Sequence, residues 1–288
     1  MGPASSTSCL MTCRTRLGSS VTMGHGPVES LRNRSGIMAC DTARRRHMQH
    51  TQYISTRGQM APAGFMDVLL AGLAPDGGLA VPERLPALTP EQLETWRSLN
   101  YAELATEVIG LFATDIPRED LAALTRAAYG ESRFPQPVVP VTGLDDVADG
   151  LVLVGLSEGP TMAFKDLAMQ FLGQAIPYVL AKQGKVLNIL GATSGDTGSA
   201  AEHAFRGQEG VSVFMLSPAG RMSPVQRAQM YTLQDANIHN IAVRGVFDDC
   251  QALVKALSND ANFKAAHHLG AVNSINIGRI AAQAVYYV

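Results

Sequence analysis

The chain has 288 residues, more than one domain usually needs, and its 46% hydrophobic and 17% charged residues are typical of a folded globular protein rather than a disordered one. Its formal net charge of −2 excludes the strongly basic character expected of a nucleic-acid or anionic-membrane binder, so we expect a small-molecule ligand. No apolar run approaches the roughly 18–20 residues that span a bilayer, which excludes a membrane helix.

Residues 1–50 differ from the rest of the chain. They hold seven arginines, only two acids and no apolar periodicity, so we expect them to be disordered. We interpret them as a mistranslated upstream leader, with Met48 as an internal start, in preference to an organellar transit peptide, because no amphipathic helix is evident. The whole chain has 23 basic and 25 acidic side chains. Without the seven basic and two acidic ones of residues 1–50, the remaining body has 16 basic and 23 acidic side chains and is therefore acidic. Of the four cysteines only Cys250 lies in that body, which indicates a reduced, cytoplasmic protein without disulfides.

Residues 51–135 are predicted to form a small N-terminal helical domain. Thr89 followed by Pro90 is typical of a helix start, with a capping side chain and proline in the first turn. The predicted helices are 64–73, 90–99, 102–112 and 118–128.

From residue 136 onward the pattern changes to short apolar runs that alternate with helical segments. This alternation predicts an α/β domain, 136–288, with a parallel or mixed sheet covered by helices on both faces. The predicted strands are 151–154, 186–190, 211–216 and 238–243. The predicted helices are 164–179, 199–206, 224–233, 248–258 and 278–288, with Pro177 expected to bend the first or to end its regular part. The last helix reaches Val288 with its apolar pattern unbroken, so we expect this domain to be incomplete at the C-terminus.

The first motif with chemical potential is GPTMAFKD, residues 159–166, at the start of the predicted helix. A lysine at a helix N-terminus feels the positive end of the helix dipole, which disfavours its ammonium form and suits it to imine chemistry. An ordinary solvated Lys165 that pairs with Asp166 or Glu158 is the alternative. A serine-nucleophile elbow at residues 155–159 is a weaker one, because Gly159 and Pro160 delay the helix that an elbow requires.

Two further polar segments open predicted helices. Residues 191–199, GATSGDTGS, place small residues and hydroxyls where backbone amides can bind a carboxylate or phosphate, although a plain connecting turn is the alternative. Their spacing matches neither a P-loop nor a dinucleotide fingerprint. Residues 273–279, NSINIGR, add a guanidinium suited to phosphate, although a capped helix with a surface arginine would also explain them.

Together these three motifs, in this order and spacing, resemble threonine synthases of the bacterial and fungal type. The segments 53–58 and 72–79 resemble the N-terminus of that family, so the resemblance covers 53–288. It implies a fold type II pyridoxal-phosphate enzyme, similar to the tryptophan synthase beta subunit. It also implies a carbon–oxygen lyase that converts O-phospho-L-homoserine and water to L-threonine and phosphate, the last step of threonine biosynthesis.

The resemblance further implies the role of each site residue. Lys165 would be the catalytic residue and the Schiff-base lysine, with Phe164 and Asp196 as further contacts to pyridoxal 5'-phosphate. Asp196 stands where many fold type II relatives carry asparagine. The implied substrate-binding residues are Thr193, Ser194, Thr197, Ser274, Asn276 and Arg279, and no metal is implied. We expect all three motifs to converge on one cleft.

Two other functions remain open at this point. A serine or threonine dehydratase would use the same lysine and loop without a phosphate site, and a catalytically inactive fragment would retain the motifs alone. In the family, a glycine- and asparagine-rich loop for the cofactor phosphate lies beyond the position that matches Val288. The sequence does not separate a monomer from a homodimer, and we expect neither nucleic acid nor membrane as a partner.

Overall fold

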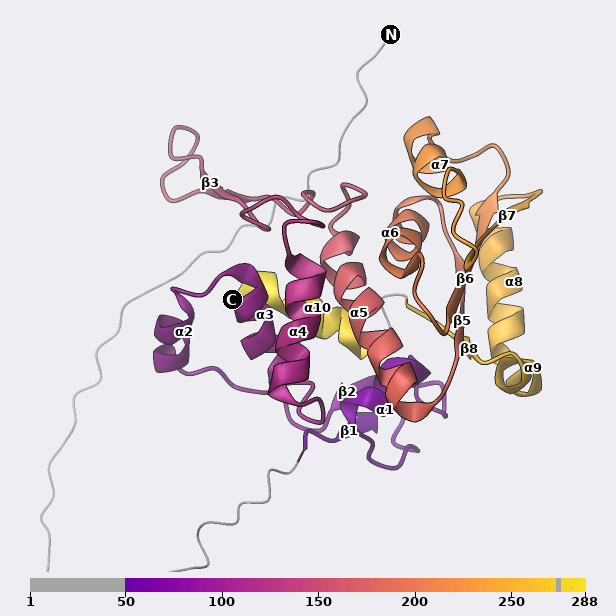
Figure 1. Ribbon diagram of the computed structural model, residues 1–288, viewed down its shortest axis with the longest axis horizontal. Helices are drawn as coiled ribbons and strands as arrows, with labels where there is room; N and C mark the ends of the chain where they lie inside the picture. The colour runs from indigo at the N-terminus through magenta and orange to yellow at the C-terminus, as the bar shows by residue number, and fades with distance from the viewer. Residues whose placement is uncertain (1–49, 273–275) are drawn as a thin grey trace, which may run out of the picture. The chain divides into compact units, whose positions relative to one another are not determined.

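The computed structural model describes residues 50–272 and 276–288 (Figure 1). These residues group into two compact units, 142–153 on one hand and 50–141 with 154–288 on the other. The predicted leader, apart from His50, and Ser274 lie outside the described residues. In the described part of the chain, no helix combines the length and apolar character that crossing a membrane would require.

The N-terminal part of the larger unit is mainly helical, as predicted. Its helices are α1 (Phe65–Ala71), α2 (Pro90–Trp96), α3 (Tyr101–Gly110) and α4 (Arg118–Tyr129). The Thr89 side chain accepts a hydrogen bond from the Gln92 amide, and the Gln92 side chain accepts one from the Thr89 amide, which confirms the predicted helix start. A short antiparallel pair, β1 (Tyr53–Ser55) and β2 (Ala80–Pro82), was not predicted.

A four-stranded parallel sheet forms the centre of the C-terminal part. The strand order is β7-β6-β5-β8, with β5 at Leu187–Ala192, β6 at Val211–Pro218, β7 at Ile238–Val243 and β8 at Leu269–Gly270. Three of these strands match the predicted ones to within two residues at each end. The two-residue β8 was not predicted, because so short a segment carries no periodicity.

Helices cover both faces of this sheet, as predicted for strands joined by crossovers. Figure 1 shows α6 (Asp196–Phe205) and α8 (Phe247–Asn259) on opposite faces of the sheet, which is seen edge-on. The other helices here are α5 (Lys165–Gln183), α7 (Pro224–Tyr231), α9 (Ala261–Ala266) and α10 (Ile277–Ala284), followed by a 3-10 turn at Val285–Tyr287.

Helix α5 is the central element of the hydrophobic core. Its side chains pack with those of α1, α6 and α10 in one buried cluster that includes Leu69, Phe171, Phe205 and Ala281. Gly173 allows the closest approach, because a Cβ at this position would lie 2.4 Å from the Ala204 carbonyl oxygen of α6. The helix continues for six residues past Pro177 and ends at Gln183, so of the two effects expected of Pro177 the ending of the helix was wrong, and a bend stays a prediction.

The predicted strand at residues 151–154 is real but its environment was predicted wrongly. We expected it to be covered on both faces within the parallel sheet. It is instead β4 (Val152–Val154), which forms a two-stranded sheet with β3 (Val141–Gly143), and all three of its residues are exposed. A short apolar run fixes an extended backbone, but it carries no information on which layers will cover it.

Candidate active site

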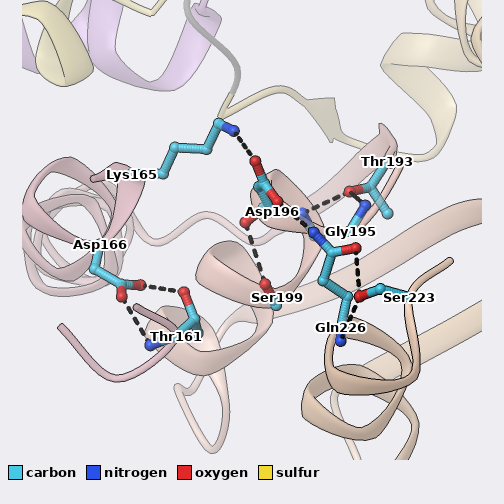
Figure 2. A network of polar contacts seen from close by, with 10 residues as sticks. Thr161, Lys165, Asp166, Thr193, Gly195, Asp196, Ser199, Ser223 and Gln226 are labelled. Atoms are coloured by element: carbon cyan, nitrogen blue, oxygen red, sulfur yellow. Dashed lines mark hydrogen bonds and ion pairs between the residues drawn. The ribbon is translucent and has the colours of Figure 1, made fainter. Parts of the chain in front are cut away.

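Lys165 is the first residue of α5 and its amine faces the second motif. Its Nζ lies 3.0 Å from Oδ2 of Asp196, which is the first residue of α6 (Figure 2). The Lys165 side chain is 17% exposed, and its Nζ lies 5.2 Å from the centre of the Phe164 ring, within cation–π range. Neither Asp166 nor Glu158 is its partner, so the alternative of a solvated lysine paired within its own motif was wrong.

Asp166 holds the lysine motif in shape rather than pairing with the lysine. Its buried carboxylate accepts hydrogen bonds from the Thr161 amide (2.7 Å) and from the Thr161 hydroxyl (2.8 Å). Burial raises the pKa of Asp166, while the hydrogen bonds from Thr161 oppose that shift. Gly159 must be small here, because a Cβ would lie 2.3 Å from the Asp166 Cβ.

The turn just before Lys165 contains a strained residue. Met162 has a φ of 56°, in the left-handed region that side chains other than glycine rarely adopt, and its side chain is exposed. The Met162 amide donates to the Gly159 carbonyl oxygen (3.0 Å), and the Thr161–Asp166 hydrogen bonds span the turn. These hydrogen bonds therefore fix the backbone that leads into Lys165.

The Thr193 side chain holds the loop after β5 together through hydrogen bonds to the loop's own backbone. The Thr193 hydroxyl oxygen accepts hydrogen bonds from the amides of Gly195 (3.0 Å) and Gly198 (2.9 Å), and the side chain is buried. Ser194 is exposed and Thr197 is half-buried. Thr193 therefore shapes the loop, whereas Ser194 and Thr197 leave hydroxyls near the start of α6, where the helix dipole favours an anion.

The third motif lies at the start of α10, but its Asn276 side chain forms hydrogen bonds with the protein's own backbone. Asn276 is buried, accepts a hydrogen bond from the Gly278 amide, and donates to the carbonyl oxygens of Leu69 (2.8 Å) and Ala271 (3.3 Å). Arg279 is only 5% exposed, and its Nε has no hydrogen-bond partner among the described residues. Burial lowers the pKa of this guanidinium.

The three motifs are therefore not equally connected. Lys165 contacts Asp196 directly, which joins the first motif to the second. Within the described residues, Asn276 and Arg279 make no hydrogen bond to either of them, although α10 packs against α5. The predicted roles of all these residues stay predictions.

Helix α7 was predicted from the sequence, as 224–233, but its contacts with the candidate site were not. The Nε2 of Gln226 donates to Asp196 Oδ1, and the Nε2 of Gln229 donates to the Thr161 carbonyl oxygen. The helix was predicted to begin at residue 224, as it does, but nothing in the sequence pointed to these long-range partners. Two pockets of about 210 and 330 Å³ lie elsewhere, the smaller between β6 and α7 beside Arg227 and Tyr231, and neither is lined by Lys165.

The fold and the candidate site are those of fold type II pyridoxal-phosphate enzymes. They combine a parallel sheet that helices cover on both faces, a lysine at the start of one helix, and a hydroxyl-rich loop before the next helix. Residues 52–129 match the family model described as threonine synthase N terminus. The chain is 57% identical over 242 residues to threonine synthase of Corynebacterium glutamicum and 54% identical over 241 residues to that of Methylobacillus glycogenes. The chain belongs to the threonine synthase family.

The likeness extends to solved structures. The structure of pyridoxal-phosphate-bound threonine synthase from Brucella melitensis matches with a TM-score of 0.77 at 45% identity, covering 82% of this chain and 50% of that one. The two relatives above are likewise covered over 50% and 51% of their length, with 82% of this chain aligned. The chain thus spans about half the length of the curated relatives that it matches.

Proposed function

We propose that this chain contributes to a threonine synthase, which converts O-phospho-L-homoserine and water to L-threonine and phosphate. The observation that carries the proposal is the position of Lys165, which is the first residue of α5 and whose amine faces Asp196 at the start of α6. The curated relatives named threonine synthase support it. No observation favours a serine or threonine dehydratase or an inactive fragment.

Pyridoxal 5'-phosphate fits the residues around Lys165. The Asp196 carboxylate holds the Lys165 amine at 3.0 Å, and the lysine side chain is 17% exposed, so the amine has a fixed position that solvent and a small molecule can still reach. When bound, the cofactor supplies an electron sink for charge that develops at the substrate α carbon. Lys165 would hold it covalently and carry protons at the α and β carbons, with Phe164 and Asp196 beside it.

The substrate would be held by its two anionic groups. Ser194, Thr197 and the backbone amides at the start of α6 suit a carboxylate or phosphate, and Thr193 keeps this loop in shape. Arg279 has no carboxylate partner in the described part of the chain, and a buried guanidinium without a counter-charge favours an anion such as the substrate phosphate. Asn276 would fix the start of the helix that carries Arg279, and Ser274 stays a predicted phosphate ligand.

We also propose the domain division at 135/136, a cytoplasmic location, the absence of nucleic-acid partners and either a monomer or a homodimer. The change at residue 136 from a helical to an α/β pattern supports the domain division. The acidic body and the single body cysteine support the location and the absence of nucleic acid.

The first test is the absorbance spectrum of the purified 288-residue protein with added pyridoxal phosphate. We expect a band near roughly 410 nm from the lysine–cofactor adduct, lost in Lys165→Ala and retained in Lys182→Ala, a control at the exposed end of the same helix. Addition of O-phospho-L-homoserine should perturb the band and release phosphate. A band that survives in Lys165→Ala, or no band in the folded wild type, would contradict the proposal for this chain.

A further inference from the structure

Helix α7 begins with a side-chain arrangement that orients one glutamine. Ser223 is the N-cap residue, and its Oγ accepts a hydrogen bond from the Gln226 amide (3.2 Å). The same hydroxyl donates to Gln226 Oε1 (3.0 Å). Because Oε1 is thereby the accepting end, the amide is fixed with Nε2 pointing away from Ser223.

The fixed end of Gln226 points at the partner of Lys165. Its Nε2 donates to Asp196 Oδ1, while the other oxygen of the same carboxylate, Oδ2, faces Lys165 Nζ at 3.0 Å (Figure 2). The chain of contacts therefore runs from Ser223 through Gln226 and Asp196 to Lys165. Each oxygen of Asp196 has its own partner.

The loop before α6 is shaped to admit this glutamine. Gly195 has a φ of 142°, and a Cβ there would lie 2.3 Å from Gln226 Cδ. Glycine is thus required twice at this position, for the backbone conformation and for the close approach of the amide. The Gly195–Asp196 pair and Gln226 form one packed unit, although 30 residues separate Asp196 from Gln226.

The exposure of Asp196 explains why such a support is needed. Its side chain is 51% exposed, so without a second anchor the carboxylate is free to rotate toward water. Exposed ion pairs gain little when their side chains must first be immobilised. A donor on Oδ1 removes that freedom and leaves Oδ2 aimed at Lys165.

We propose that Gln226 is a positioning residue of the active site, which holds the Asp196 carboxylate so that it faces the Lys165 amine. The relevance of this contact to catalysis rests on the proposed function, whereas the contact itself does not. Gln226 acts through Asp196 and touches neither the lysine nor any reacting atom.

The test measures the reactivity of Lys165 in the cofactor-free 288-residue protein. Trace acetylation with acetic anhydride, followed by mass spectrometry of the Lys165 peptide, reports how readily this amine reacts. In Gln226→Met the Asp196 carboxylate is no longer held against the Lys165 amine, so the contact that occupies this amine is weakened and Lys165 should react roughly two- to fourfold faster at pH 8. Gln251→Met, the same change on helix α8, should leave the rate unchanged.

A double-mutant cycle separates positioning from a general structural role. In an Asp196→Ala background, Gln226→Met should have no further effect on Lys165, because the residue through which it acts is gone. An unchanged or slower rate in the single variant, or an equal increase in the Asp196→Ala background, overturns the proposal. If Gln226→Met does not fold, Gln226→Asn, whose amide is one methylene too short to reach Asp196, should show the same increase.

The two proposals fail in different ways. A protein without the cofactor band would contradict the assignment of Lys165 to pyridoxal phosphate, but its acetylation rates would still test Gln226. Conversely, a normal cofactor band together with an unchanged acetylation rate in Gln226→Met would remove only the positioning role.

Discussion

Two buried carboxyl groups, on the neighbouring helices α5 and α6, differ in how many of their oxygens accept a hydrogen bond. Asp166 and Glu202 are both fully buried. Each Asp166 oxygen accepts a hydrogen bond from Thr161. Glu202 Oε2 accepts one from Asn240 (3.1 Å), whereas Glu202 Oε1 has no partner within the described residues.

The difference shows that donors as well as burial set the charge state of a carboxyl group. Burial raises the pKa of Glu202 to about 8, with only the Asn240 hydrogen bond to oppose it. Burial also raises the pKa of Asp166, but hydrogen bonds from Thr161 counteract the shift. Burial therefore favours the protonated form of Glu202, whereas the hydrogen bonds from Thr161 stabilise the charged form of Asp166.

Removing the better-satisfied carboxylate should have the largest effect on stability. Asp166→Ala leaves the Thr161 amide and hydroxyl without acceptors and opens a small cavity, which should lower the free energy of unfolding by about 4 kcal/mol. Urea denaturation followed by circular dichroism measures this change. Asp248→Ala, at an exposed position in the first turn of α8, is the matched control and should cost less than about 1 kcal/mol. A loss as small as that of the control would mean that Asp166 does not hold the motif.

The second prediction concerns the pH dependence that Glu202 imposes. Its folded-state pKa, about 8, lies above the unfolded value of 4.5, so its contribution is fully present below about pH 4.5 and is lost as the pH rises through 8. Glu202→Gln removes this titration. We expect the stability of the wild type relative to Glu202→Gln to fall by about 2 kcal/mol between pH 5 and pH 6.5.

Denaturation of both proteins across this pH range provides the measurement. Glu209→Gln, at an exposed position just beyond the same helix, should give a difference that does not change with pH. A flat difference for Glu202→Gln as well would show that this carboxyl is ionised or hydrated in the folded protein.

The smallest effect should come from a single hydrogen bond to Asp166. Thr161→Val removes the hydroxyl donor but keeps the backbone amide, so the free energy of unfolding should fall by about 1 kcal/mol. Thr161→Ser keeps the hydroxyl and should retain most of the stability. An unchanged stability in Thr161→Val would show that the hydroxyl hydrogen bond to Asp166 contributes little.

Local patterns predicted most of the elements of this protein. The capping pair Thr89–Pro90 and the apolar strands β5, β6 and β7 were found from sequence because their signals lie within a few residues. The same reasoning failed for β4, whose exposure depends on what pairs with it, and for β1, β2 and β8, which are too short to show periodicity. Pro177 did not end α5, because packing on both sides of the helix outweighs one lost backbone hydrogen bond.

The candidate site divides in the same way. The sequence by itself determined that Lys165 opens a helix, that a hydroxyl-rich loop opens the next, and that the three motifs match one family. Only the tertiary structure decided that Lys165 faces Asp196 rather than its neighbour Asp166, that Asn276 is used to bond the Leu69 carbonyl, and that Gln226 holds Asp196. The physical reason is range: caps and periodicity act over a few residues, whereas these contacts join segments 30 to 207 residues apart that meet only when the helices pack.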